Sequence, residues 1–410
     1  MIQVYLAVGA VMLSVALMQV ASGIFSTFLP IRLAADNYPP NAIGLMATGH
    51  ALGFFVACLV AATIIRRVGH IRAFAFFAAL NGVGALSFYA LVDPWWWAGV
   101  RTVIGFCTAG MFVVAESWLT DKTPRSMRGS VIAVYMVGQK LSFAGGQLAL
   151  ALGDLLGATF FMLASAFYVL AIMPLSLTAA ASPALPQVNR LGVRELYAIA
   201  PAALVSSFLI GLMNAAVTHV GPLYGAAVGY SVAEVGAMMA AMQVGSLLIQ
   251  WPMGWTSDRI DRRLVIIAAA GACAVLSLLI ALLAGVPGGW MLVLFGLWGA
   301  FALSIYGICV AHANDFAPQG QTVSVSSGLL LCWAVGSIVG PLLATQTMAW
   351  IGPPGLFLQA GVAAAAMAGF VGWRMTRRKP VPVEERAPWS TVPTTSPAAA
   401  ALDPRQNEQT

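Results

Sequence analysis

Charge is scarce in this chain of 410 residues. Only 8% of the residues are Asp, Glu, Lys or Arg, while 60% are apolar, and a soluble domain carries about 25% charged residues. This balance excludes an ordinary water-soluble enzyme, a disordered chain and a fibrous repeat. Cysteine is also sparse, and all five cysteines lie in apolar stretches without the spacing of disulfides or metal ligands. The sequence therefore predicts a polytopic membrane protein with no metal site and no cofactor.

Long stretches without any charge fill the second half of the chain. Residues 264–314 and 316–373 contain no Asp, Glu, Lys or Arg, and each stretch is long enough for two crossings of about 20 residues. Because the stretches are continuously apolar rather than alternating, the crossings are predicted to be helices. The first apolar run extends to Leu33, too long for a cleavable signal sequence. We expect an all-α integral membrane fold with twelve transmembrane helices, near residues 4–33, 41–65, 73–92, 95–119, 129–152, 155–178, 199–227, 231–257, 264–285, 288–313, 322–349 and 353–373.

The two halves of the chain repeat each other weakly. A shift of 192 residues places Pro30 on Pro222, Gly44 on Gly236 and Arg67 on Arg259 without a gap. Such a repeat is typical of a transporter built from two parallel halves around a site at mid-membrane. The predicted units are a six-helix bundle (1–178), a cytoplasmic linker (179–197), a second six-helix bundle (198–375) and a cytoplasmic tail (376–410) whose Pro, Ala, Ser and Thr content predicts disorder.

The basic residues are distributed unevenly along the expected spans. Of the 20 Lys and Arg, all but Arg32, Arg101 and Lys140 fall in loops or the tail on one side of a twelve-span arrangement. The positive-inside rule then places both termini in the cytoplasm of a bacterial cell, with the chain in its cytoplasmic (inner) membrane. Five tryptophans would cluster at the opposite interface, namely Trp95, Trp96, Trp97, Trp290 and Trp350.

A loop between the eighth and ninth spans carries the clearest motif. The string GWTSDRIDRR, residues 254–263, resembles the G-x-x-x-D-R-x-x-R-R loop of the major facilitator superfamily. The resemblance extends over residues 4–375, and AESWL at 115–119 resembles the bacterial YcaD-like group within that superfamily. Arg101-x-x-x-Gly105 is similar to a second superfamily motif, carried in many proton-coupled exporters. The resemblance implies two pseudo-symmetric bundles that rock around a central cavity.

The loop motif also implies gating contacts. Asp258 is expected to face the N-terminus of the fifth span near Arg128, closing the cytoplasmic side. Arg66 stands where the family has Asp, so we expect Arg66 or Arg67 to pair with Asp315, unless these cations reflect the positive-inside bias alone. The residues expected to gate are Arg66, Arg67, Gly69, Gly254, Asp258, Arg259, Arg262, Arg263 and Asp315.

Three charges stand out inside the expected spans, where a charge near mid-membrane costs at least about 2.5 kcal/mol without a partner or a wet cavity. In the functional interpretation Glu116 binds and releases a proton, while Lys140 and Arg101 hold it or an anionic group of the substrate. In the structural interpretation Lys140 pairs with Glu116, and Arg101 pairs with an aspartate at the rim, Asp93 or Asp154. Both interpretations stay open at this level.

Uncharged polar residues complete the expected cavity. His219 is a proton carrier or a packing residue, and His50 and His312 are weaker candidates. On the helices that line the cavity in the family, the polar and aromatic candidates are Gln19, Asn214, Gln243, Tyr135, Tyr306 and Trp333. A mostly apolar pocket uses a few such groups to orient a ligand.

These observations predict a secondary active transporter for a small organic molecule. Proton coupling is expected because a membrane carboxylate is present and a P-loop is not. The excess of cations over Glu116 favours an anionic or zwitterionic substrate. The alternatives are proton-coupled efflux of apolar drugs and a transporter-like sensor or assembly partner that moves nothing. No catalytic constellation predicts an enzyme, and the expected partners are substrate, protons and the lipid bilayer, for a monomer that binds no nucleic acid.

Overall fold

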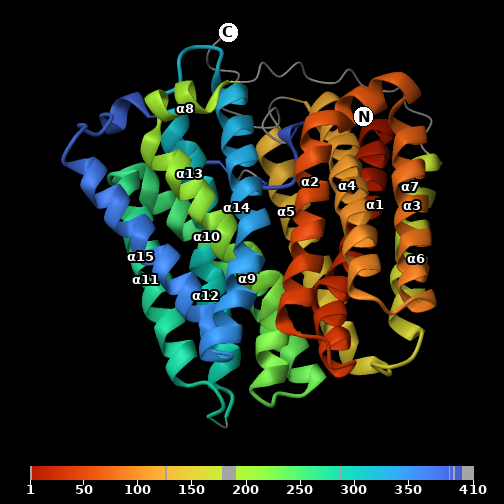
Figure 1. Ribbon diagram of the computed structural model, residues 1–410. Coiled ribbons are helices and arrows are strands. Elements are labelled where there is room, and N and C mark those ends of the chain that lie inside the picture. The colour runs from red at the N-terminus through yellow and green to blue at the C-terminus, as the bar shows by residue number, and fades with distance from the viewer. Residues whose placement is uncertain are drawn as a thin grey trace.

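The computed structural model describes residues 2–124, 127–177, 191–286, 288–386, 388–390 and 393–398. The described residues form helices and connecting turns, without strands. Figure 1 shows the helices gathered into two groups that follow the two halves of the chain. The expected linker lies partly outside the described residues, and so does the end of the tail.

Each group contains six crossings, one of which is interrupted. The first bundle comprises α1 (Ile2–Ala35), α2 (Pro40–Val68), α3 (His70–Ala90), α4 (Pro94–Lys122), α5 (Arg128–Leu148), and α6 (Thr159–Leu170) continued by α7 (Ile172–Ser176). The second comprises α9 (Pro201–Ala227), α10 (Val232–Arg259), α11 (Arg262–Leu282), α12 (Trp290–Ala302) continued by α13 (Ile305–Asn314), α14 (Thr322–Ile351) and α15 (Gly355–Met375). Three short elements lie outside these crossings, namely η2 (Ala149–Leu152) after α5, α8 (Val193–Ile199) before α9 and η3 (Val383–Glu385) after α15.

Within the described residues, eleven of these crossings are long and apolar enough to span a membrane by themselves. The twelfth is α5, a helix of 21 residues that packs between α1 and α10. It is less apolar because it carries Gln139, Lys140 and Gln147. The predicted all-α fold with twelve transmembrane helices in two bundles is therefore confirmed.

The repeat is preserved in how helices approach each other. A methyl group on Gly53 or Gly105 would collide with backbone atoms across the α2–α4 contact, at Thr102 and His50. In the second half, the equivalent Gly245 and Gly299 meet backbone across the α10–α12 contact. Glycine permits this close approach, which improves van der Waals packing where lipid supplies no hydrophobic driving force. The same glycine pair thus fixes the same helix contact in both halves.

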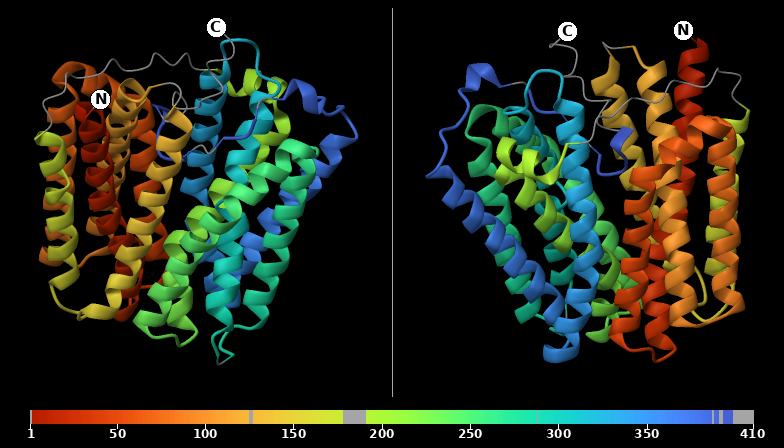
Figure 2. Two further views of the ribbon diagram at one scale, coloured as in Figure 1. Left: turned by 180° about the vertical axis from the view of Figure 1, so that it is seen from behind. Right: turned by 45° about the horizontal axis from the view of Figure 1, so that its top comes forward.

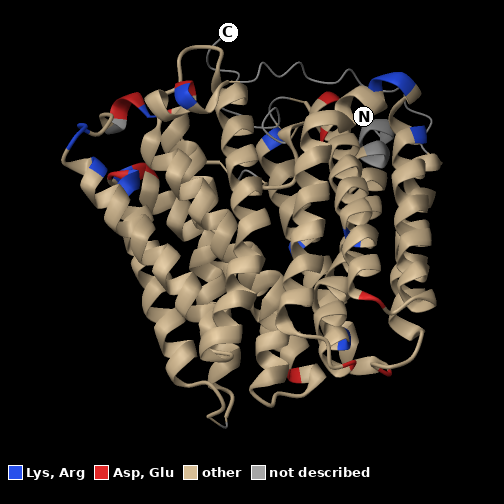
Figure 3. Cartoon of the chain, viewed as in Figure 1, with Lys and Arg blue, Asp and Glu red and all other residues tan. Residues whose placement is uncertain are grey.

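The two ends of the molecule differ in charge. Most Lys and Arg residues gather at the end where α1 begins (Figure 3); we refer to it as the basic end, defined by the last turns of α2 and α10 and the first turn of α11. Exposed tryptophans mark the opposite end, at the starts of α4 and α12 and the last turn of α14: Trp95, Trp290 and Trp350.

The bundles meet mainly through α2 with α14 and α5 with α10. Thr48 Oγ1 on α2 donates a hydrogen bond of 2.9 Å to the carbonyl oxygen of Ile338 on α14. Nearer the opposite end, a methyl group on Gly44 would collide with Thr345 of α14, and one on Gly236 with the backbone of Gln147. Figure 2 shows the helices of the two groups converging toward the opposite end. The halves are therefore packed together on that side.

Candidate functional site

A cavity of about 270 Å³ lies between the two bundles. This is close to the lower end of the range for small-molecule sites, about 300 Å³. Its walls come from α1, α2, α4 and α5 on one side and from α9, α10, α13 and α14 on the other. Its polar and aromatic lining includes Gln19, Ser22, His50, Phe54, Thr108, Phe112, Gln139, Lys140, Phe143, Asn214, Thr218, His219, Gln243, Tyr306, Trp333 and Ser337.

Most residues predicted for this cavity from sequence do line it. They come from six helices and are Gln19, Lys140, His219, Asn214, Gln243, Tyr306 and Trp333. Asn214 is already engaged, because its Nδ2 donates to the carbonyl oxygen of Ala302, where α12 breaks before α13. Arg101, Glu116 and Tyr135 are buried beside the cavity rather than in its lining.

Lys140 connects the two halves at the cavity wall. Its Nζ donates a hydrogen bond of 2.6 Å to Ser246 Oγ and one of 3.3 Å to Gln250 Oε1, both on α10. Among the described residues it forms no ion pair with Glu116, so the structural interpretation of that pair is wrong for this conformation. An ammonium group held by two neutral oxygens keeps its charge available to the cavity.

Two histidines from opposite halves meet in the cavity. The rings of His50 on α2 and His219 on α9 are 5.5 Å apart between centroids, edge to face. Arg101 is close enough to act electrostatically on both rings. His50 Nδ1 and Arg101 Nε are buried without a hydrogen-bond partner among the described residues. Buried polar atoms of this kind call for a ligand, ion or water.

The rim aspartates have other partners than Arg101. Asp93 Oδ1 accepts from the Trp96 amide at 2.8 Å and caps α4. Asp154 Oδ1 accepts from the Leu156 amide at 3.0 Å. The predicted pairing of Arg101 with either aspartate is therefore wrong, because both carboxylates hold backbone groups at the opposite end.

Glu116 is fully buried on α4, toward the basic end. Tyr135 on α5 donates a hydrogen bond of 3.1 Å to Glu116 Oε1. The hydroxyl groups of Thr395 and Ser396, in the tail after α15, also donate to the Glu116 carboxylate. Pro393, Thr394 and Thr395 are part of the cavity lining. The tail was expected to be disordered, yet its described residues follow a defined path into the site.

Comparison with known proteins agrees with this geometry. The sequence model of the Major Facilitator Superfamily matches residues 11–203 and again residues 202–403. The chain belongs to the major facilitator superfamily. It is therefore a multi-pass membrane transporter, and the double match reflects the repeat seen in its helix contacts.

Relatives within the superfamily are bacterial. The chain is 26% identical over 341 residues to an uncharacterized MFS-type transporter, YcaD, of Salmonella dublin, covering 81% of this chain and 86% of that protein. It is 26% identical over 388 residues to an uncharacterized MFS-type transporter of Yersinia pestis (strain Pestoides F), covering 92% and 96%. The predicted resemblance to the YcaD-like group is confirmed.

Solved structures share the fold. The nucleoside transporter NupG superposes with a TM-score of 0.76 at 12% identity, covering 91% of this chain and all of that one. A D-xylose-proton symporter superposes with a TM-score of 0.71 at 14% identity, covering 93% and 99%. At these identities the likeness concerns the fold alone.

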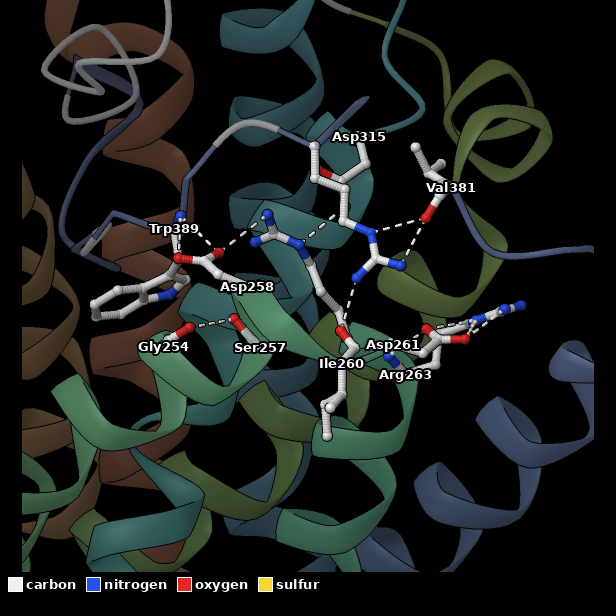
Figure 4. Close-up of polar contacts among 11 residues, drawn as sticks. Gly254, Ser257, Asp258, Ile260, Asp261, Arg263, Asp315, Val381 and Trp389 are labelled. Atoms are coloured by element: carbon white, nitrogen blue, oxygen red, sulfur yellow. Dashed lines mark hydrogen bonds and ion pairs between the residues drawn. The ribbon is translucent and has the colours of Figure 1, made fainter. Parts of the chain in front are cut away.

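The superfamily loop motif forms a charged cluster at the basic end (Figure 4). Arg262 Nε lies 2.9 Å from Asp315 Oδ2, and Arg262 Nη2 lies 3.4 Å from Asp258 Oδ1. The side chains of Arg262 and Asp315 are almost completely buried. The predicted pairing of Asp315 with Arg66 or Arg67 is wrong, because Asp315 pairs with Arg262 of its own bundle. The Arg66 side chain is exposed and contacts Thr63.

The remaining motif residues shape the ends of helices. Gly69 has a φ of +86°, a left-handed conformation that lets α2 turn directly into α3. Arg259 stacks on the Trp255 ring, 3.6 Å from its centroid. Asp261 caps α11 through the amide of Arg263 and pairs with its guanidinium at 2.7 Å. Partial burial alone would raise the pKa of Asp261, but its bonds to Arg263 lower the pKa overall.

Sequence reasoning missed two features of this site. The sequence makes His50 a weaker candidate for the site than His219, since only the folded chain shows that the two rings meet across the bundles. The tail contacts were missed because small residues and prolines carry no periodic signal. The Thr-Thr-Ser run at 394–396 was the one available hint of hydrogen-bonding capacity.

Proposed function

We propose that this transporter carries a small anionic or zwitterionic organic molecule, driven by the proton gradient. One observation carries the choice of substrate. The Lys140 ammonium group lines the cavity and the Arg101 guanidinium is buried beside it, while no carboxylate is among the lining residues that the structure describes. A low-dielectric cavity with cationic groups favours a ligand that brings negative charge.

Proton coupling rests on the placement of Glu116. It is buried next to the cavity and toward the basic end, with hydroxyl groups as its hydrogen-bond partners rather than cations. A buried carboxylate without a cationic partner is inexpensive to protonate, since the neutral form avoids the desolvation cost. Glu116 therefore supplies the proton site and the cavity cations supply the substrate site.

The proposal includes the orientation of the protein in the membrane. The basic end faces the cytoplasm of a bacterial inner membrane, with both termini on that side and the protein acting as a monomer. The halves pack together at the opposite end through α2 and α14, so this conformation corresponds to a cavity closed toward the periplasm.

Export of apolar drugs is the second candidate. Phe54, Phe112, Phe143 and Trp333 contribute aromatic surface to the cavity, which would suit a lipophilic ligand. The two candidates differ in the charge of the molecule that binds near Lys140.

A binding screen followed by flux measurement separates the candidates. Purified protein is screened by thermal shift with organic anions, zwitterions, nucleosides, pentoses and lipophilic cations. We expect anions or zwitterions to stabilise the protein, and Lys140→Gln to abolish that stabilisation while Lys122→Gln, at the surface, preserves it. Stabilisation by lipophilic cations alone would favour drug export.

Hits are then tested in proteoliposomes. An imposed pH gradient should drive uptake of the bound compound by the unmodified protein. Glu116→Gln should lose gradient-driven uptake but keep exchange of labelled for unlabelled compound across the membrane. Uptake that ignores the pH gradient would refute proton coupling.

A further inference from the structure

The chain after α15 turns back across the basic end of the second bundle. Arg378 Nη1 donates to the carbonyl oxygen of Ile199 at 2.8 Å, and Arg263 Nη1 donates to that of Arg378 at 2.7 Å. Farther along, Arg386 Nη1 donates to the carbonyl oxygen of Ile260 at 2.7 Å. Three arginines therefore hold the tail near the loop motif, and Figure 4 shows its residues Val381 and Trp389 beside that motif.

Trp389 docks the tail on that motif. Its backbone amide donates to both carboxylate oxygens of Asp258, at 2.8 and 3.0 Å. Its indole ring lies against Gly254 and beside Gly307, and any side chain on Gly254 would collide with the ring. The glycine and aspartate of the motif, on α10, thus receive a residue of the chain's own tail.

The following described residues, 393–398, lie between the bundles. Pro393, Thr394 and Thr395 line the cavity, and Ser396 is 1% exposed. The Thr395 and Ser396 hydroxyl groups reach Glu116 on α4. The tail is therefore held by the second bundle at Trp389 and by the first bundle at Glu116, with the mouth of the cavity between these two points.

We propose that the tail is a tethered ligand of this transporter: residues 388–390 and 393–398 dock in the mouth of the cavity at the basic end and block entry of solutes from that side. A solute can exchange there only after the tail releases Glu116. The entropic cost of docking is low because the segment is rich in small side chains and prolines, which lose little conformational entropy when they are ordered. The covalent tether also gives the segment a high effective concentration at the cavity.

The proposal goes beyond the transport function and differs from a purely structural role of the tail. A structural segment would be needed for folding, and its loss would destabilise both bundles. A tethered ligand would leave the fold intact and change only access to the cavity. Access of a reagent to the cavity can be measured without knowing the substrate or the driving force. The result of that measurement therefore does not depend on the proposed transport activity.

The test uses a cysteine probe in the cavity. The five native cysteines are replaced by alanine and Met136, which lines the cavity, is changed to Cys in protein held in nanodiscs. The rate of modification by a charged maleimide is measured for the full chain, for a chain ending at residue 398 and for a chain ending at residue 386. We expect the full chain and the chain ending at residue 398 to react at the same rate. The chain ending at residue 386 should react about tenfold faster, which corresponds to an undocked state populated at about 10% in the full chain.

Point variants in the full chain test the docking itself. Thr395→Val with Ser396→Ala, and separately Trp389→Ala, should accelerate modification. Thr376→Val is the matched control and should leave the rate unchanged, since among the described residues the Thr376 hydroxyl bonds only the carbonyl of Trp373 at its own helix end. Equal rates for the full and shortened chains, or for the docking variants and the control, would overturn the proposal.

Discussion

Lys140 on α5 donates a hydrogen bond of 2.6 Å to Ser246 on α10, so a cation in the wall of one bundle is held by a hydroxyl group of the other. Gln250, one turn further along α10, accepts the second bond at 3.3 Å. If transport proceeds by rocking of the two halves, as the proposed function requires, we expect this contact to break in the opposite conformation.

Ser246→Ala should lower the free energy of unfolding by about 1–3 kcal/mol, because it removes a partner of a buried charged donor. Thermal unfolding of the protein in detergent measures the change. Ser87→Ala is the control, since the hydroxyl groups of both serines bond a carbonyl in their own helix but only Ser246 accepts from Lys140. Equal losses for the two serines would contradict the assigned role.

The buried pair of Arg262 and Asp315 makes a second prediction. Asp315→Asn should destabilise the protein by up to about 3–5 kcal/mol, because it removes the nearer and more deeply buried of the two carboxylates that pair with the Arg262 guanidinium. Replacing both, as Arg262→Met with Asp315→Leu, should recover most of that loss. Arg66→Gln should change stability by less than about 0.5 kcal/mol, and a loss there as large as that of Asp315→Asn would restore the sequence-based pairing.

The glycine contacts predict an asymmetry within one helix. Gly105→Ala should destabilise the protein strongly, because the new methyl group meets the backbone at His50. Gly99→Ala, on the same helix with open space around it, should be neutral or stabilising by up to about 1 kcal/mol from helix propensity. The yield of monodisperse protein and its melting temperature measure the effect of each substitution. Similar outcomes for the two glycines would refute the close α2–α4 contact.

Membrane orientation is tested by labelling single cysteines in a cysteine-free background. We expect Trp350→Cys to react with a membrane-impermeant maleimide in intact spheroplasts and Arg67→Cys to react only in inside-out vesicles. The reason is that cations are retained on the cytoplasmic side during insertion. The reverse pattern would place the termini outside and overturn the assignment of the basic end.

The fold was accessible from sequence because its determinants are local. Apolar runs such as 264–314, the constant offset between Gly44 and Gly236 and the motif at 254–263 each report on a nearby stretch of chain. The cavity residues followed from the same logic, since a polar side chain such as Gln19 or Asn214 in an apolar helix needs an interior position.

The partners of charged groups were not accessible in the same way. Arg66, Arg67 and Arg262 are equivalent in a count of charges, and only the packing of α11 against α13 selects Arg262 for Asp315. The hydroxyl groups that bond to Glu116 belong to Thr395 and Ser396, which lie 279 and 280 residues away along the chain. A contact of that separation, made by a segment without hydrophobic periodicity, leaves no pattern in the sequence.

The composition of α5 bears on how the protein is made. A ribosome delivers this segment to the lipid with Gln139, Lys140 and Gln147 still uncovered, and the partners of Lys140 on α10 lie 106 and 110 residues further along the chain. Such a segment does not partition into hydrocarbon alone, so biogenesis has to keep it in the translocation machinery or against α1 until the second half arrives. The same polar groups that face the cavity keep the fifth crossing, unlike the other eleven, from being apolar enough to span a membrane by its own composition.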